Sequence, residues 1–66
     1  MRVTINGTST EVAEGITVAD LIATRTEQRR RVAVAVNSEV VPRSGWETTS
    51  LRAGDSVEIL AAAAGG

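Results

Sequence analysis

The sequence begins with "MRVTINGTSTEVA" (residues 1–13), in which a run of alternating apolar and polar residues precedes an Asn-Gly pair. Alternation with a period of two, in a segment rich in β-branched residues, is typical of a half-buried strand. Asn6 and Gly7 both tolerate the positive φ angles that a two-residue type I′ turn requires. The stretch therefore predicts a β-hairpin, whose short second strand is anchored to the core by Val12.

The segment after the hairpin, "TVADLIATR" (residues 17–25), has the pattern of a short amphipathic helix. Thr17 suits the N-cap position, and Asp20 three residues later completes an approximate capping box and favours the helix N-terminus electrostatically. The apolar face is narrow and consists of Val18, Leu21 and Ile22. A helix of this length is unstable alone in water, so we expect it to pack on a sheet.

The second half of the chain contains three further candidate strands. "VAVAV" (residues 32–36) is typical of a central strand, with its valines facing the helix and its alanines on the opposite side. A brief extended piece follows at residues 40–41, and Pro42 makes it short or places it at a sheet edge, because proline cannot donate to a ladder. The last candidate strand follows a Gly-Asp turn and alternates Val57 and Ile59 with Glu58 and Leu60.

Together these elements predict one α+β domain over residues 1–66, with residues 61–66 as a C-terminal tail. The arginine-rich run "RTEQRRR" (residues 25–31) is interpreted as a solvated connection or frayed helix end. Trp46, the single aromatic residue, is expected to cap a small core. The first and last strands would have to pair in parallel across the whole chain, and the residue pattern does not establish that pairing.

The composition removes most of the side chains that enzymes use for catalysis. The 66 residues include no Cys, His, Lys or Tyr. A thiolate or imidazole metal ligand, a histidine general base and a lysine Schiff base are therefore excluded. Of the eight carboxylates, Glu11 and Glu14 are expected at a strand end and a turn, and Glu39 and Glu47 in loops, and nothing places two of them across a cleft. We expect no metal site.

The charge balance also limits the partners. A net charge of −1 and a pI of about 5.2 do not suit a nucleic-acid binder, whose affinity depends on neutralising phosphates. The longest apolar run is too short to cross a bilayer, and the first residues lack the pattern of a secretory leader. We expect a soluble cytoplasmic protein that binds neither nucleic acid nor membrane.

The tail, "AAAAGG" (residues 61–66), directly follows the last candidate strand. Terminal alanine and glycine are often uninformative and disordered. However, residues without bulk or charge can also thread a narrow channel into another protein, and glycine permits close backbone approach. If the carboxylate of Gly66 has to be activated, a partner must supply the nucleotide. The sequence thus offers this carboxylate as its main candidate functional group.

Two further segments, "VNSEVVPRSGW" and "GDSVEIL", complete a pattern that extends along the whole chain. With the terminal Gly-Gly and the short length, the sequence resembles the thiamine-biosynthesis sulfur carrier family (ThiS). This resemblance implies the ubiquitin-like β-grasp fold, a mixed sheet of four to five strands with one main helix on one face and a flexible C-terminal tail.

The resemblance also implies a function. A ThiF-like adenylyltransferase would use ATP to adenylate Gly66, and a sulfur donor such as a cysteine desulfurase would convert the adenylate to a thiocarboxylate. A ThiG-like thiazole synthase would then accept the sulfur. Gly66 would carry the sulfur, Gly65 would give access, and Ala63 and Ala64 would form a slender lead. The protein would be a co-substrate that binds no cofactor itself, and not an enzyme.

Other interpretations remain open at this point. The small subunit of molybdopterin synthase uses the same thiocarboxylate, although its members are usually longer and carry aromatic or proline residues near the tail, and this chain has no Phe. A ubiquitin-like protein modifier and a non-catalytic interaction module are further alternatives. By analogy with carriers of this fold, the exposed face beside the last strand, including Leu60, is the expected partner contact, and Arg43 is a second candidate.

Overall fold

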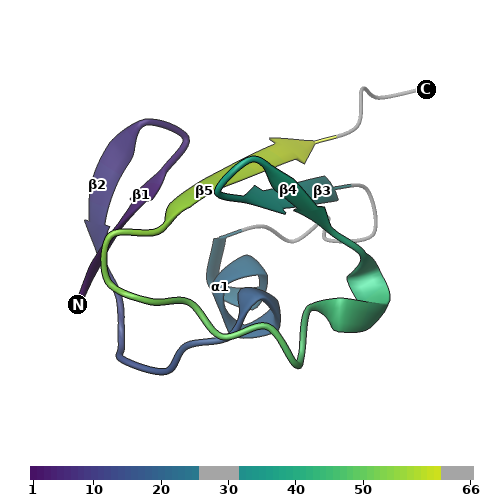
Figure 1. Ribbon diagram of the computed structural model, residues 1–66, viewed down its shortest axis with the longest axis horizontal. Coiled ribbons are helices and arrows are strands. Elements are labelled where there is room, and N and C mark those ends of the chain that lie inside the picture. Colours follow the sequence, from purple (N-terminus) through teal and green to yellow (C-terminus); the bar gives the residue numbers. More distant parts are fainter. Residues whose placement is uncertain (26–31, 62–66) are drawn as a thin grey trace.

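The protein folds into a five-stranded sheet with one α-helix packed on one face (Figure 1). The computed structural model describes residues 1–25 and 32–61. The strand order is β2-β1-β5-β3-β4. In chain order the elements are β1 (Arg2–Ile5), β2 (Thr8–Glu11), α1 (Val18–Arg25), β3 (Val32–Val36), β4 (Glu39–Val41), the short 3₁₀ helix η2 (Arg43–Gly45) and β5 (Ser56–Ala61).

The first hairpin has the predicted geometry. β1 and β2 are antiparallel, with Ile5 opposite Thr8, so only Asn6 and Gly7 form the loop. Their φ angles of 50° and 84° are both positive, as a type I′ turn requires. The second strand, predicted to include Val12, ends one residue earlier, at Glu11. Val12 lies beyond it and packs against the core, partly buried, as expected.

The predicted capping box is present at the start of α1. The Asp20 backbone N–H donates to Thr17 Oγ1 at 3.1 Å, and the Thr17 backbone N–H donates to Asp20 Oδ2 at 3.4 Å. These reciprocal bonds satisfy N–H groups at the helix start that have no partner within the helix. The helix buries the predicted apolar face, Val18, Leu21 and Ile22, against the sheet.

A second two-residue turn, at Asn37 and Ser38, joins β3 to β4 in an antiparallel pair. Both turn residues have positive φ angles, 51° and 72°. β4 is an edge strand of three residues and ends before Pro42, which confirms the prediction from proline. β3 has a neighbour on each side, but the prediction that it is the central strand is only partly right, because β5 occupies the middle of the sheet.

The central place of β5 results from its two neighbours. β5 pairs in parallel with β1, with Thr4 beside Ser56 and Ile5 beside Val57, and antiparallel with β3. The sheet is therefore mixed, as the resemblance implies. The core between sheet and helix consists of Val3, Ile5, Val18, Leu21, Ile22, Val34, Trp46, Leu51 and Val57.

Trp46 closes one end of this core, as predicted. Its side chain is only 5% exposed, and its Nε1–H donates to the Val41 carbonyl oxygen at 2.9 Å. The hydrogen bond satisfies the one polar group of a side chain that is otherwise apolar. η2 and the turn after it thus attach to the end of β4.

Two predictions fall on residues outside those described. The first is the interpretation of the arginine-rich run (residues 25–31). Arg25 is the last residue of α1, and residues 26–31 lie outside the described residues. The expected flexibility of the tail concerns residues 62–66, since Ala61 is the last residue of β5. Within the described ranges, no helix has the length and hydropathy needed to cross a membrane.

Candidate functional site

The structure fixes the point from which the predicted tail starts. Gly66, Gly65, Ala64 and Ala63 lie outside the described residues, so their positions stay predictions. Ala61 is described, and it lies opposite Val32 of β3. The tail therefore follows directly on the central strand of the sheet (Figure 1).

Leu60 lies one residue before the end of this strand and is 66% exposed. It lies opposite Ala33 of β3, whose side chain is also exposed. Their inward-facing neighbours are the next pair of the register, Val34 and Ile59. Because successive side chains of a strand point to opposite faces, Leu60 and Ala33 face away from α1.

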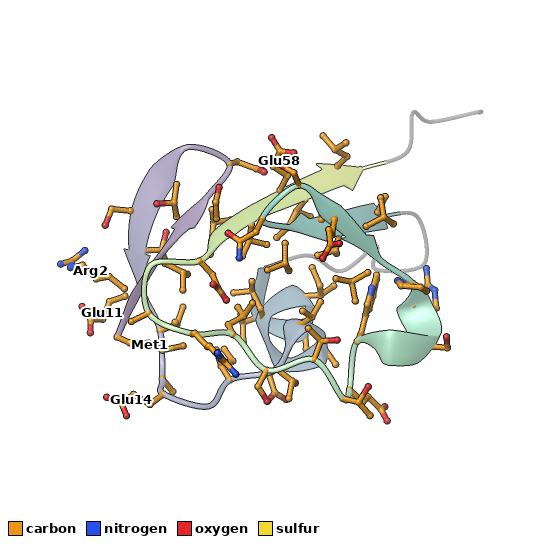
Figure 2. The ribbon with its side chains drawn as sticks, in the orientation of Figure 1. Met1, Arg2, Glu11, Glu14 and Glu58 are labelled. Carbon is orange, nitrogen blue, oxygen red and sulfur yellow. The ribbon has the colours of Figure 1, made fainter. Side chains whose placement is uncertain are left out.

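The same face continues toward the edge strand. Ala35 of β3 lies opposite Glu58 of β5 on one side and opposite Val40 of β4 on the other. Val40 is 74% exposed, and Figure 2 shows Glu58 directed away from α1. We refer to Ala33, Ala35, Val40, Glu58 and Leu60 as the outer face.

The outer face combines large and small apolar side chains. Within the described ranges, Val40 and Leu60 are the large hydrophobic residues that stay exposed. Only the small alanines of β3 stand between them in the sheet, and the one charge on the outer face is Glu58. Isolated exposed apolar residues are common, but contiguous ones on a sheet face are typical of a binding surface.

Sequence reasoning identified Leu60 but missed Val40. The available signal was the pattern of residues 39–41, in which Val40 stands between Glu39 and Val41 in a strand predicted to be short or at an edge. Period-two alternation predicts that Val40 points to the side opposite Glu39 and Val41, but it does not tell which of the two sides is exposed. What the pattern lacked was the register that brings Val40 opposite Ala35.

The structure places Arg43, the other predicted contact, elsewhere. Its guanidinium carbon lies 4.9 Å from the centre of the Trp46 ring, a cation–π arrangement. With Ala19 of α1 and with Trp46, Arg43 lines a shallow hollow on the helix side of the molecule. Arg43 and Leu60 therefore belong to different surfaces.

The charged side chains of residues 1–24 and 32–60 lie at the surface and do not gather in large clusters. Arg2 and Glu11 face each other across the first hairpin, with Nε and Oε1 3.5 Å apart, and both are mostly exposed (Figure 2). Such pairs contribute little to stability. Among residues 1–24 and 32–60 no polar side chain is buried, and the described residues contain no group of three acidic side chains suited to a metal ion.

Comparison with known proteins gives one family. Residues 3–66 match the profile of the ThiS family. Over its full length the chain is 29% identical to the sulfur carrier protein ThiS of Escherichia coli (strain K12), which is covered completely as well. It is also 35% identical to a segment of the thiazole synthase of Paramagnetospirillum magneticum (strain ATCC 700264 / AMB-1), and it spans only 20% of the length of that protein.

Solved structures agree with these matches. The crystal structure of the thiamine biosynthesis protein ThiS from Geobacter metallireducens superposes with a TM-score of 0.87, at 36% identity and with both chains covered completely. A solution structure of a thiamine biosynthesis protein from the same organism gives a TM-score of 0.77 at 36% identity, over 91% of this chain and 81% of that one.

Proposed function

The chain belongs to the ThiS family and has its ubiquitin-like β-grasp fold, and we propose that it carries sulfur for thiazole formation in thiamine biosynthesis. The observation that carries this proposal is the match to the sulfur carrier protein of E. coli over the whole of both chains. The terminal Gly-Gly, which the carrier chemistry needs, lies within the matched range.

The proposed chemistry takes place at the carboxylate of Gly66. This carboxylate attacks the α-phosphorus of ATP in the site of a ThiF-like adenylyltransferase, and pyrophosphate leaves. A persulfide sulfur, supplied by a donor such as a cysteine desulfurase, attacks the acyl carbon and displaces AMP. Cleavage of the remaining S–S bond by a thiol leaves the thiocarboxylate. Adenylation is needed because a free carboxylate is a poor electrophile.

The residues before Gly66 provide access to it in this proposal. Gly65 has no side chain, so its backbone can approach a partner's site closely. Ala63 and Ala64 add only methyl groups and keep the lead to the reacting carbon narrow. The chain acts as a co-substrate, and its partners supply the catalytic groups and the bound nucleotide.

We propose the outer face as the docking surface for the adenylyltransferase, with Leu60 and Val40 as its apolar contacts. Leu60 stands six residues before Gly66, so a partner that binds it also has the tail within reach. At about 3.3–3.6 Å per extended residue, that reach is roughly 20 Å. Arg43 is proposed as a weaker contact, because it lies on the helix side and is already engaged by Trp46.

Thiazole synthase is the proposed acceptor of the sulfur. The support is the relative named thiazole synthase, in which one fifth of the sequence matches this chain. A carrier segment within such a protein suggests that carrier and synthase work together. The small subunit of molybdopterin synthase, which uses the same chemistry, has no comparable support among these relatives.

The pathway can be tested with the thiocarboxylated chain as sole sulfur source. We expect it to support thiazole formation by a thiazole synthase, and not molybdopterin formation by the large subunit of molybdopterin synthase. A chain without Gly66, treated in the same way, is the control and should support neither reaction. Molybdopterin formation without thiazole formation would overturn the assignment to thiamine biosynthesis.

A further inference from the structure

The turn of the first hairpin is hydrogen-bonded to the last strand. The Asn6 side-chain oxygen Oδ1 accepts the Ile59 backbone N–H at 2.8 Å, and Asn6 Nδ2–H donates to the Ile59 carbonyl oxygen at 3.2 Å. The two residues are 53 positions apart in the chain. One side chain thus engages both backbone groups of a residue two positions before the end of β5.

These bonds take the place of a missing rung of the parallel ladder. Between β1 and β5, the Thr4 N–H donates to the Asp55 carbonyl and the Asn6 N–H donates to the Val57 carbonyl, both at 2.9 Å. The next rung would use both backbone groups of Ile59. After Asn6 the chain turns away from β5. The side-chain amide of Asn6 therefore supplies the hydrogen-bond acceptor and donor that the backbone of a longer β1 would supply.

The end of β5 depends on this replacement. Residues 59–61 pair with β3 on one side, through Val34, Ala33 and Val32. On the other side, among the described residues, Asn6 is the group that bonds to their backbone. Without it the last three residues of β5 would be held along one edge only, and strand ends held in this way fray at low free-energy cost.

We propose that Asn6 is a positioning residue, which holds the end of β5 so that the tail starts from a fixed point when Gly66 enters the site of an adenylating partner. This inference rests on the proposed function. Frayed residues would have to be ordered again on binding, at a cost in conformational entropy. The expected consequence is weaker binding of the carrier and an unchanged chemical step.

Asn37 provides a matched control within the same strand. It is the first residue of the other hairpin turn, its φ angle of 51° equals that of Asn6 within a degree, and its Oδ1 accepts the Ser56 N–H at 3.0 Å. Its Nδ2–H donates to Asp55 Oδ1 at 3.1 Å. Asn37 therefore attaches to the start of β5 as Asn6 attaches to the end.

The test compares Asn6→Gly with Asn37→Gly. Glycine adopts positive φ angles readily, so both turns are preserved and both variants lose two side-chain hydrogen bonds. We expect similar thermal midpoints for the two variants. In adenylation assays with a ThiF-like adenylyltransferase, Asn6→Gly should raise KM about tenfold with kcat unchanged, and Asn37→Gly should change KM less than about twofold.

Hydrogen exchange in the free proteins gives a readout without any partner. The Ile59 amide should exchange at least about tenfold faster in Asn6→Gly than in wild type, and should be unchanged in Asn37→Gly. Asn6→Asp retains the acceptor for the Ile59 N–H but not the donor, so its KM should lie between wild type and Asn6→Gly.

Three outcomes would overturn the inference. If Asn6→Gly and Asn37→Gly raise KM equally, the effect comes from general loosening of β5. If Asn6→Gly is adenylated like wild type although the Ile59 amide hydrogen exchanges faster with solvent, the end of β5 does not position the tail. Both of these outcomes leave the proposed function standing. A wild-type chain that the adenylyltransferase does not adenylate would instead overturn the proposed function and this inference together.

Discussion

Ile5 of β1 lies beside Val57 of β5 in a parallel pair, and both side chains are buried, with 2% and 0% of their surface exposed. This pair joins the first hairpin to the last strand and makes β5 the centre of the sheet. The tail therefore follows on a strand whose first residues, Ser56 and Val57, have neighbours on both sides. We propose that this small folded domain presents its chain end to partner enzymes.

The Ile5–Val57 contact predicts a large loss of stability in Ile5→Ala. Replacing a buried isoleucine by alanine typically costs about 2–5 kcal/mol, because it leaves a cavity as well as removing apolar contacts. For a domain of 66 residues this is a large part of the total stability. Urea unfolding measures the effect. Val40→Ala, at an exposed position, should stay within about 0.5 kcal/mol of wild type. Equal losses in the two variants would contradict the core described above.

The capping box predicts a smaller, specific effect at Thr17. Thr17→Ala removes the hydroxyl that accepts the Asp20 N–H and should lower the free energy of unfolding by about 0.5–2 kcal/mol. Thr17→Ser retains a hydroxyl in the same place and should be close to wild type. The two variants are compared by thermal unfolding followed by circular dichroism. If serine destabilised as much as alanine, the hydroxyl would not be the cause.

The outer face predicts a separation of stability from function at Leu60. Leu60→Glu places a charge on an exposed position, so the unfolding free energy should change by less than about 0.5 kcal/mol. Its kcat/KM in adenylation should fall about tenfold or more, as expected when a charge enters an apolar contact. Ser9→Glu is the matched control. Ser9 lies opposite Thr4 at the far edge of the same sheet face, and this variant should be adenylated like wild type. Equal rates for both variants would place the docking surface elsewhere.

Arg43→Ala separates a structural from a binding role. The guanidinium over the Trp46 ring predicts a loss of about 0.5–1 kcal/mol in the free energy of unfolding. The effect of Arg43→Ala on kcat/KM should be smaller than that of Leu60→Glu, since Arg43 lies on the helix side. The same unfolding and adenylation assays measure both. A larger kinetic effect at Arg43 than at Leu60 would move the principal contact to the hollow beside α1.

The features predicted correctly from the residue pattern are mostly local. The Asn6-Gly7 turn and the Thr17–Asp20 capping box depend on residues one to three positions apart, so their conformational preferences can be read from the sequence. The residue pattern also indicated the burial of Trp46, because a lone large aromatic side chain has few alternatives to the core of a small domain.

The features that the residue pattern missed join distant segments. "VAVAV" was the most apolar run and therefore suggested the centre of the sheet, but the parallel pairing of β1 with β5 gives that place to β5. No local preference encodes a pairing across the whole chain, and the mixed sheet was expected only from the family resemblance. The bonds between Asn6 and Ile59 and the exposure of Val40 on the outer face were missed for the same reason.

The central claim, that the carboxylate of Gly66 carries the sulfur, is tested most directly by intact-protein mass spectrometry. The chain is incubated with ATP, magnesium, a ThiF-like adenylyltransferase, a cysteine desulfurase and cysteine. We expect the mass to rise by the difference between one sulfur and one oxygen atom. The gain should disappear when Gly66 is deleted or when one residue is added after it. An unchanged mass under conditions that convert a control sulfur carrier, or the same gain without Gly66, would contradict the claim.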